Sequence, residues 1–509
     1  MTTQTEIERK YDVDETAVLP DITGVPGVAR VEPAGEAHLE AEYFDTARAD
    51  LAAHRIVLRR RRGGADEGWH IKLPAAEGRT ELHWPLTDDD APPRQIVEQV
   101  LSRTRGRELA VIAKLRTHRV LTHLVAGDGT GLVEIADDTV SATDVGTGVL
   151  RLWREWEVEL LDGAAATDRA ALLDAVEERL VAAGATPSAS RSKLASALGR
   201  TDLGETGADD ASAPDTTAPK LRRSSPASQV LLVAVGALVD DLARIDPLVR
   251  ADQHDAVHQL RTRIRRLRSL FASYRTVFDR EVTDPLRDRL QAVGLALGDA
   301  RDTEVLRERA RTLLEDHEPL AKNVDRRLVG TLGEQYTADH AQAVATLSGD
   351  DWLTLLDDLD AFVARPALAA GAMLPASEVV PPALDADLHR VLVRAKAARR
   401  GDLDDERLHE VRKAAKRLRY AVEAVSQGDA GVFGKKTRKL AAAAEAVHDL
   451  LGEHRDSTLM QQRLRATAGS GATAFDYGVL HEVERHGAAL CLAEYPAALR
   501  ALRSRRSRR

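Results

Sequence analysis

The chain has 509 residues, which exceeds one ordinary domain and predicts two or three. Its formal net charge of −9 excludes a uniformly basic polyanion binder, so any anion site depends on local clusters of arginine and lysine. The single cysteine, Cys491, excludes an internal disulfide and is typical of a reducing cytoplasm. The N-terminus has no apolar signal core, and the apolar run at residues 230–239 is about half of the ~20 residues that a membrane span needs. We therefore expect a cytoplasmic protein without a membrane partner.

The first two hundred residues read as a series of strands. Alternating side-chain character and intervening glycine turns predict strands at residues 5–13, 55–62, 68–73, 80–86, 109–124, 130–137 and 152–161. Helical spacing of apolar residues predicts helices at 93–103 and 167–184. This part of the chain is therefore expected to form a β-rich domain.

Charged side chains of both signs share one face on many of these strands, because alternate residues of a strand point the same way. A solvated face would explain one such strand, whereas five indicate an enclosed polar space, as in a closed barrel. The groups are Glu6, Glu8 and Lys10; Arg59 and Arg61; His70 and Lys72; Lys114 and Arg116; and Glu155, Glu157 and Glu159.

The types of charge indicate what the barrel encloses. Arginine and lysine donate charge-assisted hydrogen bonds to phosphate oxygens. Carboxylates in the same space would repel phosphate unless a divalent cation lies between them, and Mg²⁺ prefers carboxylate and phosphate oxygens. The pattern therefore predicts a site for a complex of a metal ion with a chain of phosphates.

At these positions the sequence resembles the CYTH superfamily, the triphosphate tunnel metalloenzymes. An ExExK pattern at residues 6–10 is followed in family order by short motifs at residues 43–46, 58–61, 69–72, 157–159 and 192–193. The resemblance covers residues 1–200 and implies an eight-stranded antiparallel tunnel. It also implies hydrolysis of triphosphates with Mg²⁺ or Mn²⁺.

The resemblance implies roles for individual residues of this sequence. Glu6, Glu8, Glu157 and Glu159 are expected to hold metal and, with Lys10, to form the catalytic set. Asp138 joins the metal set because its strand parity matches that of Glu134, an expectation from the residues themselves. The expected phosphate-binding residues are Arg59, Arg61, Lys72, Lys114, Arg116 and Lys193. The outward parity of Arg60, Arg62 and Arg154 excludes them.

Residues 201–221 form an expected linker, because the stretch up to residue 219 is acidic, rich in small and polar residues, and free of basic ones. The chain beyond it reads as long amphipathic helices. A motif of one histidine and several basic residues at 258–268 recurs 151 positions later at 409–419. This duplication predicts a helical bundle built from two related halves.

Each copy of the motif places a basic stripe beside an apolar stripe on one helix. The two basic stripes are His258, Arg261, Arg265 and Arg268, and His409, Arg412, Lys416 and Arg419. Like charges on successive turns destabilise a helix unless a counter-charge is present, and a polyanion would supply it. We expect the two stripes to face each other across one cleft, and protonation of the histidines below about pH 6.5 to tighten binding.

This second half resembles the CHAD domain over residues 222–500, on the paired motif and on residues 301–302 and 451–456. The resemblance implies binding of inorganic polyphosphate in a basic cavity between two helical repeats. One departure is Lys416, which stands where the first copy has Arg265. The candidate polyphosphate-binding residues are His258, Arg261, Arg265, Arg266, Arg268, Arg301, His409, Arg412, Lys413, Lys416, Arg417, Arg419, His454 and Arg455. A basic tail, residues 501–509, ends the chain.

Together the two halves predict an α+β enzyme that hydrolyses inorganic triphosphate or short polyphosphate. Its helical domain is expected to bind longer polyphosphate and to localise the enzyme to polyphosphate granules. A non-catalytic scaffold and a tunnel acting on ATP or thiamine triphosphate are the alternatives. The complete carboxylate set opposes the first, and an aromatic content of only 4% opposes the second. No specific nucleic acid is expected as a partner, and nothing in the sequence indicates an oligomeric state.

Overall fold

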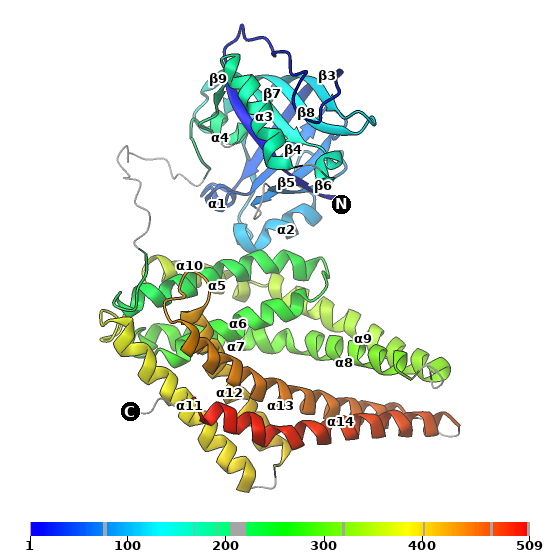
Figure 1. Ribbon diagram of the computed structural model, residues 1–509, viewed down its shortest axis with the longest axis vertical. Coiled ribbons are helices and arrows are strands. Elements are labelled where there is room, and N and C mark those ends of the chain that lie inside the picture. Colours follow the sequence, from blue (N-terminus) through cyan, green and yellow to red (C-terminus); the bar gives the residue numbers. More distant parts are fainter. Residues whose placement is uncertain are drawn as a thin grey trace. The chain divides into compact units, whose positions relative to one another are not determined.

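The structure is a computed structural model with two compact units, Met1–Ala213 and Pro214–Arg509 (Figure 1). It describes residues 2–74, 79–166, 168–190, 192–203, 220–317, 321–400, 403–468 and 472–505. Most of the predicted linker and the last four residues of the basic tail lie outside the described residues. The two units are considered separately below.

The first unit is built on a single antiparallel sheet that runs in the order β1-β6-β5-β4-β3-β7-β8-β9-β2-β10. The strands are β1 (Thr2–Glu6), β2 (Glu8–Val13), β3 (Arg30–Asp45), β4 (Val57–Arg62), β5 (Gly68–Pro74), β6 (Arg79–Trp84), β7 (Ala110–Val125), β8 (Gly131–Asp144), β9 (Leu150–Leu160) and β10 (Thr186–Pro187).

The sheet closes into a barrel through its first two strands. Only Ile7 separates β1 from β2, and β1 pairs with β6 while β2 pairs with β9. The two opposite ends of the strand order are therefore joined by one stretch of chain, which removes the sheet edges. If β1 and β2 count as one strand, the short β10 brings the total to nine, one more than the predicted eight.

Strand β3 was missed by the sequence pattern. Its 16 residues are rich in glutamate and alanine and include Pro33 and Gly35, all of which are depleted in strands. It nevertheless pairs with β7 along its whole length, with a register shift between Pro33 and Gly35. Pairing with the equally long β7 thus overrides the weak local preference.

Apolar side chains cover the outside of the barrel, opposite to the usual arrangement of a barrel with an apolar interior. Trp156 on β9 is fully buried in one cluster with residues of α3 (Arg169–Ala182), including Val176. Trp69 on β5 is buried with Ile96 of α2 (Arg94–Thr104). The inward faces carry the charged side chains of the lumen, together with apolar residues such as Leu39 and Leu121. The remaining helical segments are α1 (Asp50–Ala53), η1 (Asp162–Ala166) and α4 (Lys193–Ala197).

The second unit consists of long helices, as the sequence predicts (Figure 1). They are α5 (Ala227–Arg250), α6 (Ala256–Ser273), α7 (Arg280–Ala296), α8 (Gly298–Glu315), α9 (Ala321–Ser348), α10 (Asp350–Ala364), α11 (Ala376–Arg400), α12 (Asp405–Ser426), α13 (Lys435–Thr467) and α14 (Ala472–Arg503). Across the described residues of both units, no helix has the length and apolar character needed to cross a bilayer.

The duplicated motif lies on α6 in the first copy and on α12 in the second. The spacing of 151 positions that relates the two motifs also relates the start of α9 to the start of α14. The single helix α13 occupies the place in the second half that the two helices α7 and α8 occupy in the first. Helices α6 and α12 pack together, and the Tyr274 hydroxyl at the end of α6 donates a 2.6 Å hydrogen bond to the Ala421 carbonyl of α12. Duplication therefore brings the two basic motifs to neighbouring helices.

Candidate functional site

The barrel encloses a cavity of about 310 Å³, which we call the tunnel lumen. Acidic and cationic side chains line it in equal number, seven of each. The carboxylates are Glu6, Glu8, Asp66, Glu81, Glu134, Glu157 and Glu159, and the cations are Lys10, Arg59, Arg61, Lys72, Arg79, Arg119 and Lys193.

One wall of the lumen is formed by β4, β5 and β6 with the end of β1. Lys72 Nζ lies 2.5 Å from a carboxylate oxygen of Glu6 and 3.7 Å from one of Glu81. Glu81 also accepts from His70 Nδ1 at 2.6 Å and from Arg59 at 3.2 Å. Burial, aided by the Arg59 charge, lowers the pKa of His70 to about 3 and keeps its ring neutral.

The opposite wall is formed by β2, β7, β8, β9 and the first residue of α4. Lys193 Nζ contacts the carboxylates of Asp138, Glu155 and Glu157 at 2.9, 2.6 and 2.6 Å. Arg119 donates to both Asp138 and Glu157. One carboxylate oxygen from each of these three acidic residues lies within 4.8 Å of the other two, so the group could hold a metal ion. Lys10 forms a further ion pair with Glu157.

Two lumen carboxyl groups have raised pKa values although Lys72 lies near enough to lower them. Burial and a hydrogen bond with Glu81 raise the pKa of Glu6 to about 8. Burial and the charges of Glu8 and Glu157 raise the pKa of Glu159 to about 7. A divalent cation would relieve this crowding, and the all-oxygen donor set suits Mg²⁺ or Mn²⁺. The residues present therefore fit the metal that the resemblance implies.

Two predicted phosphate-binding residues lie outside the lumen. Lys114 and Arg116 point outward from β7 and pair with Glu42 and Glu40 at 2.8 and 3.1 Å. The odd-numbered positions of this strand face inward instead, which brings Arg119 to the lumen. Basic residues occur at both parities of β7, so only closure of the barrel identifies the inner face.

The other residues predicted for the barrel lie together. Glu6, Glu8, Lys10, Arg59, Arg61, Lys72, Glu157, Glu159 and Lys193 all line the lumen, and Asp138 is fully buried beside Lys193 and Arg119. Arg60 and Arg154 point outward, as their parity predicted, and pair with Glu42 and Asp137. No site residue was predicted on β6 from the sequence, so Glu81 and Arg79 were missed. These two residues lie on the same face of β6, and that shared parity was the signal in the sequence that could have indicated them.

The helical unit contains a cavity of about 530 Å³ between α6, α7 and α12, which we call the basic cleft. Eight arginine or lysine side chains line it, and none of its described lining residues is a carboxylate. The basic residues are Arg261, Arg265, Arg268, Arg287, Arg412, Lys413, Lys416 and Arg417. His409 lies at the same cavity, so the two predicted stripes do face one space.

The cations of the basic cleft destabilise one another's charge. Burial and the neighbouring Arg265 and Arg412 lower the pKa of Lys416 to about 6. Burial and Arg265 likewise lower the pKa of both Arg412 and Arg261. Arg261 is held by the Gly298 carbonyl at 2.9 Å and by Asp302 at 3.3 Å. The cleft thus concentrates positive charge with little acidic compensation.

Six residues predicted for polyphosphate do not line the basic cleft. Arg266 and Arg419 instead pair with the buried Glu423 of α12, at 2.8 and 2.7 Å. The others are His258, Arg301, His454 and Arg455. Arg287 and Gln291 of α7 do line the cleft but lie outside the duplicated motif, so the sequence pattern did not indicate them.

The histidines of the two motifs do not have the ordinary pKa on which the prediction of tighter binding below about pH 6.5 was based. Burial and the charge of Arg301 lower the pKa of His258 to about 4. Burial and the charge of Arg455 lower the pKa of His409 to about 4. Both imidazoles are therefore neutral across physiological pH, and Lys416 is the group of the cleft that titrates near it.

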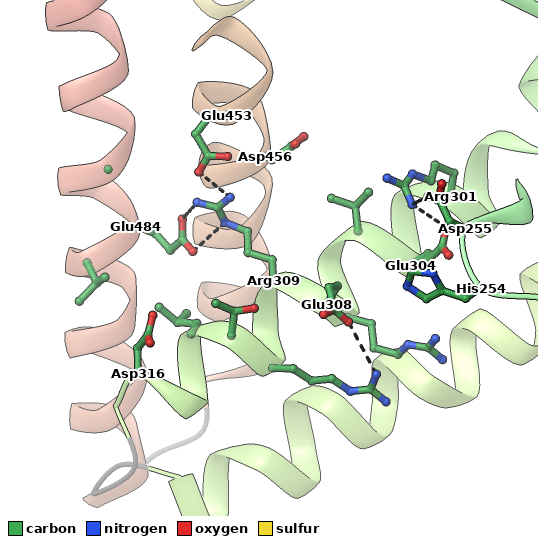
Figure 2. A pocket seen from close by; sticks show the side chains of 17 residues that line it. His254, Asp255, Arg301, Glu304, Glu308, Arg309, Asp316, Glu453, Asp456 and Glu484 are labelled. Carbon is green, nitrogen blue, oxygen red and sulfur yellow. Dashed lines mark hydrogen bonds and ion pairs between the residues drawn. The ribbon is translucent and has the colours of Figure 1, made fainter. Parts of the chain in front are cut away.

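Arg301 belongs to a separate pocket of mixed charge, about 640 Å³ in volume (Figure 2). It pairs there with Glu304 at 2.8 Å and lies 3.7 Å from Asp255. Figure 2 also shows Arg309 between Glu453 and Glu484, each 2.7 Å away. Carboxylates outnumber cations along this pocket, so it is a poorer place for a polyanion than the basic cleft.

A barrel lined by interleaved carboxylates and cations, joined in one chain to a duplicated helical bundle with a basic cleft, defines a two-domain class of protein. The family model of the CYTH domain matches residues 4–190, and that of the CHAD domain matches residues 233–465. The chain therefore belongs to the family of proteins that join a CYTH domain to a CHAD domain.

Two relatives align with this chain over nearly their whole length. Uncharacterized proteins of Mycobacterium tuberculosis strains H37Rv and CDC 1551 are each 36% identical over 524 aligned positions, which cover 98% of this chain and 96% of the relative. Among solved structures, PptA from Streptomyces chartreusis is 20% identical with a TM-score of 0.44, and covers 54% of this chain and all of its own. The CHAD domain from Ricinus communis is 23% identical with a TM-score of 0.40, and covers 58% of this chain and 96% of its own.

Proposed function

We propose that the barrel hydrolyses inorganic triphosphate, or a short polyphosphate, with Mg²⁺ or Mn²⁺. The observation that carries this proposal is the equal number of carboxylates and cations around a small lumen. The cations suit phosphate oxygens, whereas the carboxylates would repel them unless a divalent cation is bound as well. A wall of this kind suits a metal complex of a phosphate chain better than a free anion.

In the proposed reaction, the cations of both walls bind and orient the phosphate chain. Arg59, Arg61 and Lys72 act from one wall, and Lys10, Lys193 and Arg119 act from the other. Glu6, Glu8, Glu157 and Glu159, with Asp138, would hold the metal, which when bound neutralises charge on the transferred phosphoryl group. A lumen carboxylate accepts the proton of the attacking water, and the cations offset the charge that develops on the leaving phosphate.

The lumen favours an inorganic substrate over an organic one. Among the described residues that line the lumen, Tyr43 is the one aromatic side chain. The volume of the lumen, about 310 Å³, lies at the low end for small-molecule sites. A nucleobase or thiazole ring would find little surface for stacking. These features support inorganic triphosphate against ATP cyclisation or thiamine triphosphate hydrolysis.

A panel of triphosphates tests this proposal. With Mg²⁺ or Mn²⁺, we expect kcat/KM for inorganic triphosphate to exceed the values for ATP and thiamine triphosphate by about tenfold or more, since each charged contact is worth at least ~1.4 kcal/mol in the transition state. Release of phosphate and formation of cyclic AMP are measured in parallel. Preferred turnover of ATP would contradict the substrate assignment, and binding without turnover of any member would favour the scaffold.

We further propose that the basic cleft binds long inorganic polyphosphate and thereby associates a cytoplasmic enzyme with polyphosphate granules. A cavity lined by eight cations and no described carboxylate has an electrostatic field that a polyanion would neutralise. Burial of Lys416 among arginines disfavours its protonated form in the unliganded protein. A phosphate bound beside it would favour the protonated form again.

The pH dependence of polyphosphate binding follows from Lys416. Its pKa of about 6 in the free protein rises when phosphate oxygens lie beside it, so the protonated form binds more tightly. The affinity for polyphosphate should be greatest below about pH 6. Above that pH it should fall by up to about tenfold per pH unit, until the pH reaches the higher pKa that Lys416 has in the complex. Calorimetry in two buffers of different ionisation enthalpy should show proton uptake at pH 7.5.

Lys416→Arg is the matched control, because arginine stays protonated and should flatten this profile. If the affinity of the wild-type protein did not change between pH 6 and 8 and no proton were taken up, Lys416 would not contact the bound chain.

A further inference from the structure

A cluster of two histidines and one glutamate lies on the outer face of the barrel, across strands β3 and β7. His38 and His118 are directly opposite in the strand register, and their rings stack with centroids 4.8 Å apart and planes inclined by 26°. Glu36 lies two residues before His38, on the same face, and its carboxylate contacts Nε2 of His118. One coordinating atom from each residue lies within 4.8 Å of the other two.

This cluster is separate from the tunnel lumen. His118 has the parity of Lys114 and Arg116, which point outward, whereas Arg119 and Leu121 of the same strand face the lumen. Glu36 and His38 are exposed, and His118 is half-buried. The three side chains take no part in the proposed hydrolysis or in the apolar clusters of the barrel. Stacking of two histidines could occur on any solvated sheet, but it does not require a carboxylate at the same point.

We propose that Glu36, His38 and His118 bind a divalent transition-metal ion of the zinc class, with one coordination position left to solvent. Imidazole nitrogen selects Zn²⁺, Co²⁺, Ni²⁺ or Cu²⁺ over Mg²⁺, which prefers oxygen. Two histidines and one carboxylate with an open fourth position form a common zinc ligand set. The site therefore differs in metal class from the all-oxygen lumen.

The backbone holds the three ligands in position. Neighbouring register pairs, Ala37 with Arg119 and Leu39 with Thr117, fix the rung that carries the two histidines. Zinc–nitrogen distances of about 2.0–2.1 Å place tetrahedral ligands about 3.3 Å apart. The side chains must therefore close by at most about 1.5 Å from their present separation, which rotation of exposed side chains can supply without moving the strands.

The surroundings leave space for the open position. A surface cavity of about 600 Å³ borders His38 and His118, and Ser141 and Thr139 line it as well. The next pair of opposite residues on this face is Glu40 and Arg116. Their 3.1 Å ion pair engages the Glu40 carboxylate. Glu40 is thus a matched control on the same strand and face.

The test is titration of the full chain with Co²⁺ in excess Mg²⁺, followed by the visible absorption of coordinated Co²⁺ and by displacement with Zn²⁺. We expect one equivalent to bind with the spectrum of a site that has nitrogen ligands. His38→Ala and His118→Ala should each weaken Co²⁺ binding by about tenfold or more, because a directly coordinating group is lost, and Glu36→Gln should weaken it too. Zn²⁺ should raise the Tm of the wild-type chain but not that of His118→Ala.

Two controls make the outcome decisive. Glu40→Gln keeps the cluster intact, and His389→Ala removes an exposed histidine from the helical unit, so both should bind Co²⁺ like the wild type. The proposal is overturned if no Co²⁺ binds in excess Mg²⁺. It is equally overturned if binding is unchanged in His38→Ala and His118→Ala, since the ion would then lie elsewhere on the chain.

Discussion

Replacing Glu8 with glutamine is expected to lower kcat for triphosphate hydrolysis by about 10²-fold or more and to raise the Mg²⁺ concentration needed for half-maximal rate. Glu8 lines the lumen, where burial alone would raise its pKa but the charge of Lys10, 3.6 Å away, lowers it. The carboxylate is therefore ionised and available to a metal ion. Initial rates of phosphate release across a Mg²⁺ series measure the effect.

The choice of Glu8 avoids an ambiguity that Glu157 would bring. Glu157 pairs with Lys10, Lys193 and Arg119, so Glu157→Gln would leave buried cations without their partner and cost about 3–5 kcal/mol of stability. Loss of activity in that variant could reflect unfolding. Glu40→Gln, on the outer face of the same barrel, is the matched control and should keep full activity. A Glu8→Gln protein that is folded and fully active at limiting Mg²⁺ would refute the metal assignment.

Removing four charges of the basic cleft together should weaken polyphosphate binding by about 10³-fold or more, since each charged contact contributes about 1 kcal/mol or more. The variant combines Arg265→Gln and Arg268→Gln on α6 with Arg412→Gln and Lys416→Gln on α12. Changes on one helix alone should have a smaller effect, because both helices line one cavity. Affinity should also lose much of its dependence on salt, by analogy with counterion release from nucleic acids.

The thermal stability of this variant distinguishes loss of a binding site from loss of structure. The four cations that this variant lacks repel one another in the free wild-type protein. Their removal should therefore leave the Tm unchanged or raise it. Arg301→Gln lies in the separate mixed-charge pocket and should retain near wild-type affinity. Polyphosphate binding that survives loss of all four charges would place the ligand outside the basic cleft.

Much of the barrel could be predicted from strand alternation. The parity of residues 6–10, 59–61, 70–72 and 157–159 indicated which side chains share the interior. All of these side chains line the lumen except His70, which is buried beside the lumen residue Glu81. The same reasoning failed for β7, where Lys114 and Arg116 have one parity and Arg119 the other. Alternation relates residues within a strand but does not identify the inner face when both faces are polar.

In the helical unit too, the sequence predicted some features of the site, and the packing of the helices decided others. Duplication of the basic motif predicted that α6 and α12 would contribute equivalent stripes to one cleft, and most members of those stripes line it. Arg266 and Arg419 have similar local patterns but turn to Glu423. Ion pairs between distant residues depend on how the helices pack, and no sequence spacing reveals them.

By itself, the sequence determined the two-part organisation, the charged interior faces of most strands and the repeated basic motif, because these follow from periodicities of two and 3.6 residues along a single element. The tertiary structure alone decided which face of β7 closes over the lumen, which arginines keep their charge free of carboxylates, and that two histidines and a glutamate meet on β3 and β7. Each of these depends on register and packing between elements far apart in the chain, where side chains become neighbours only after the barrel closes and the helices pack.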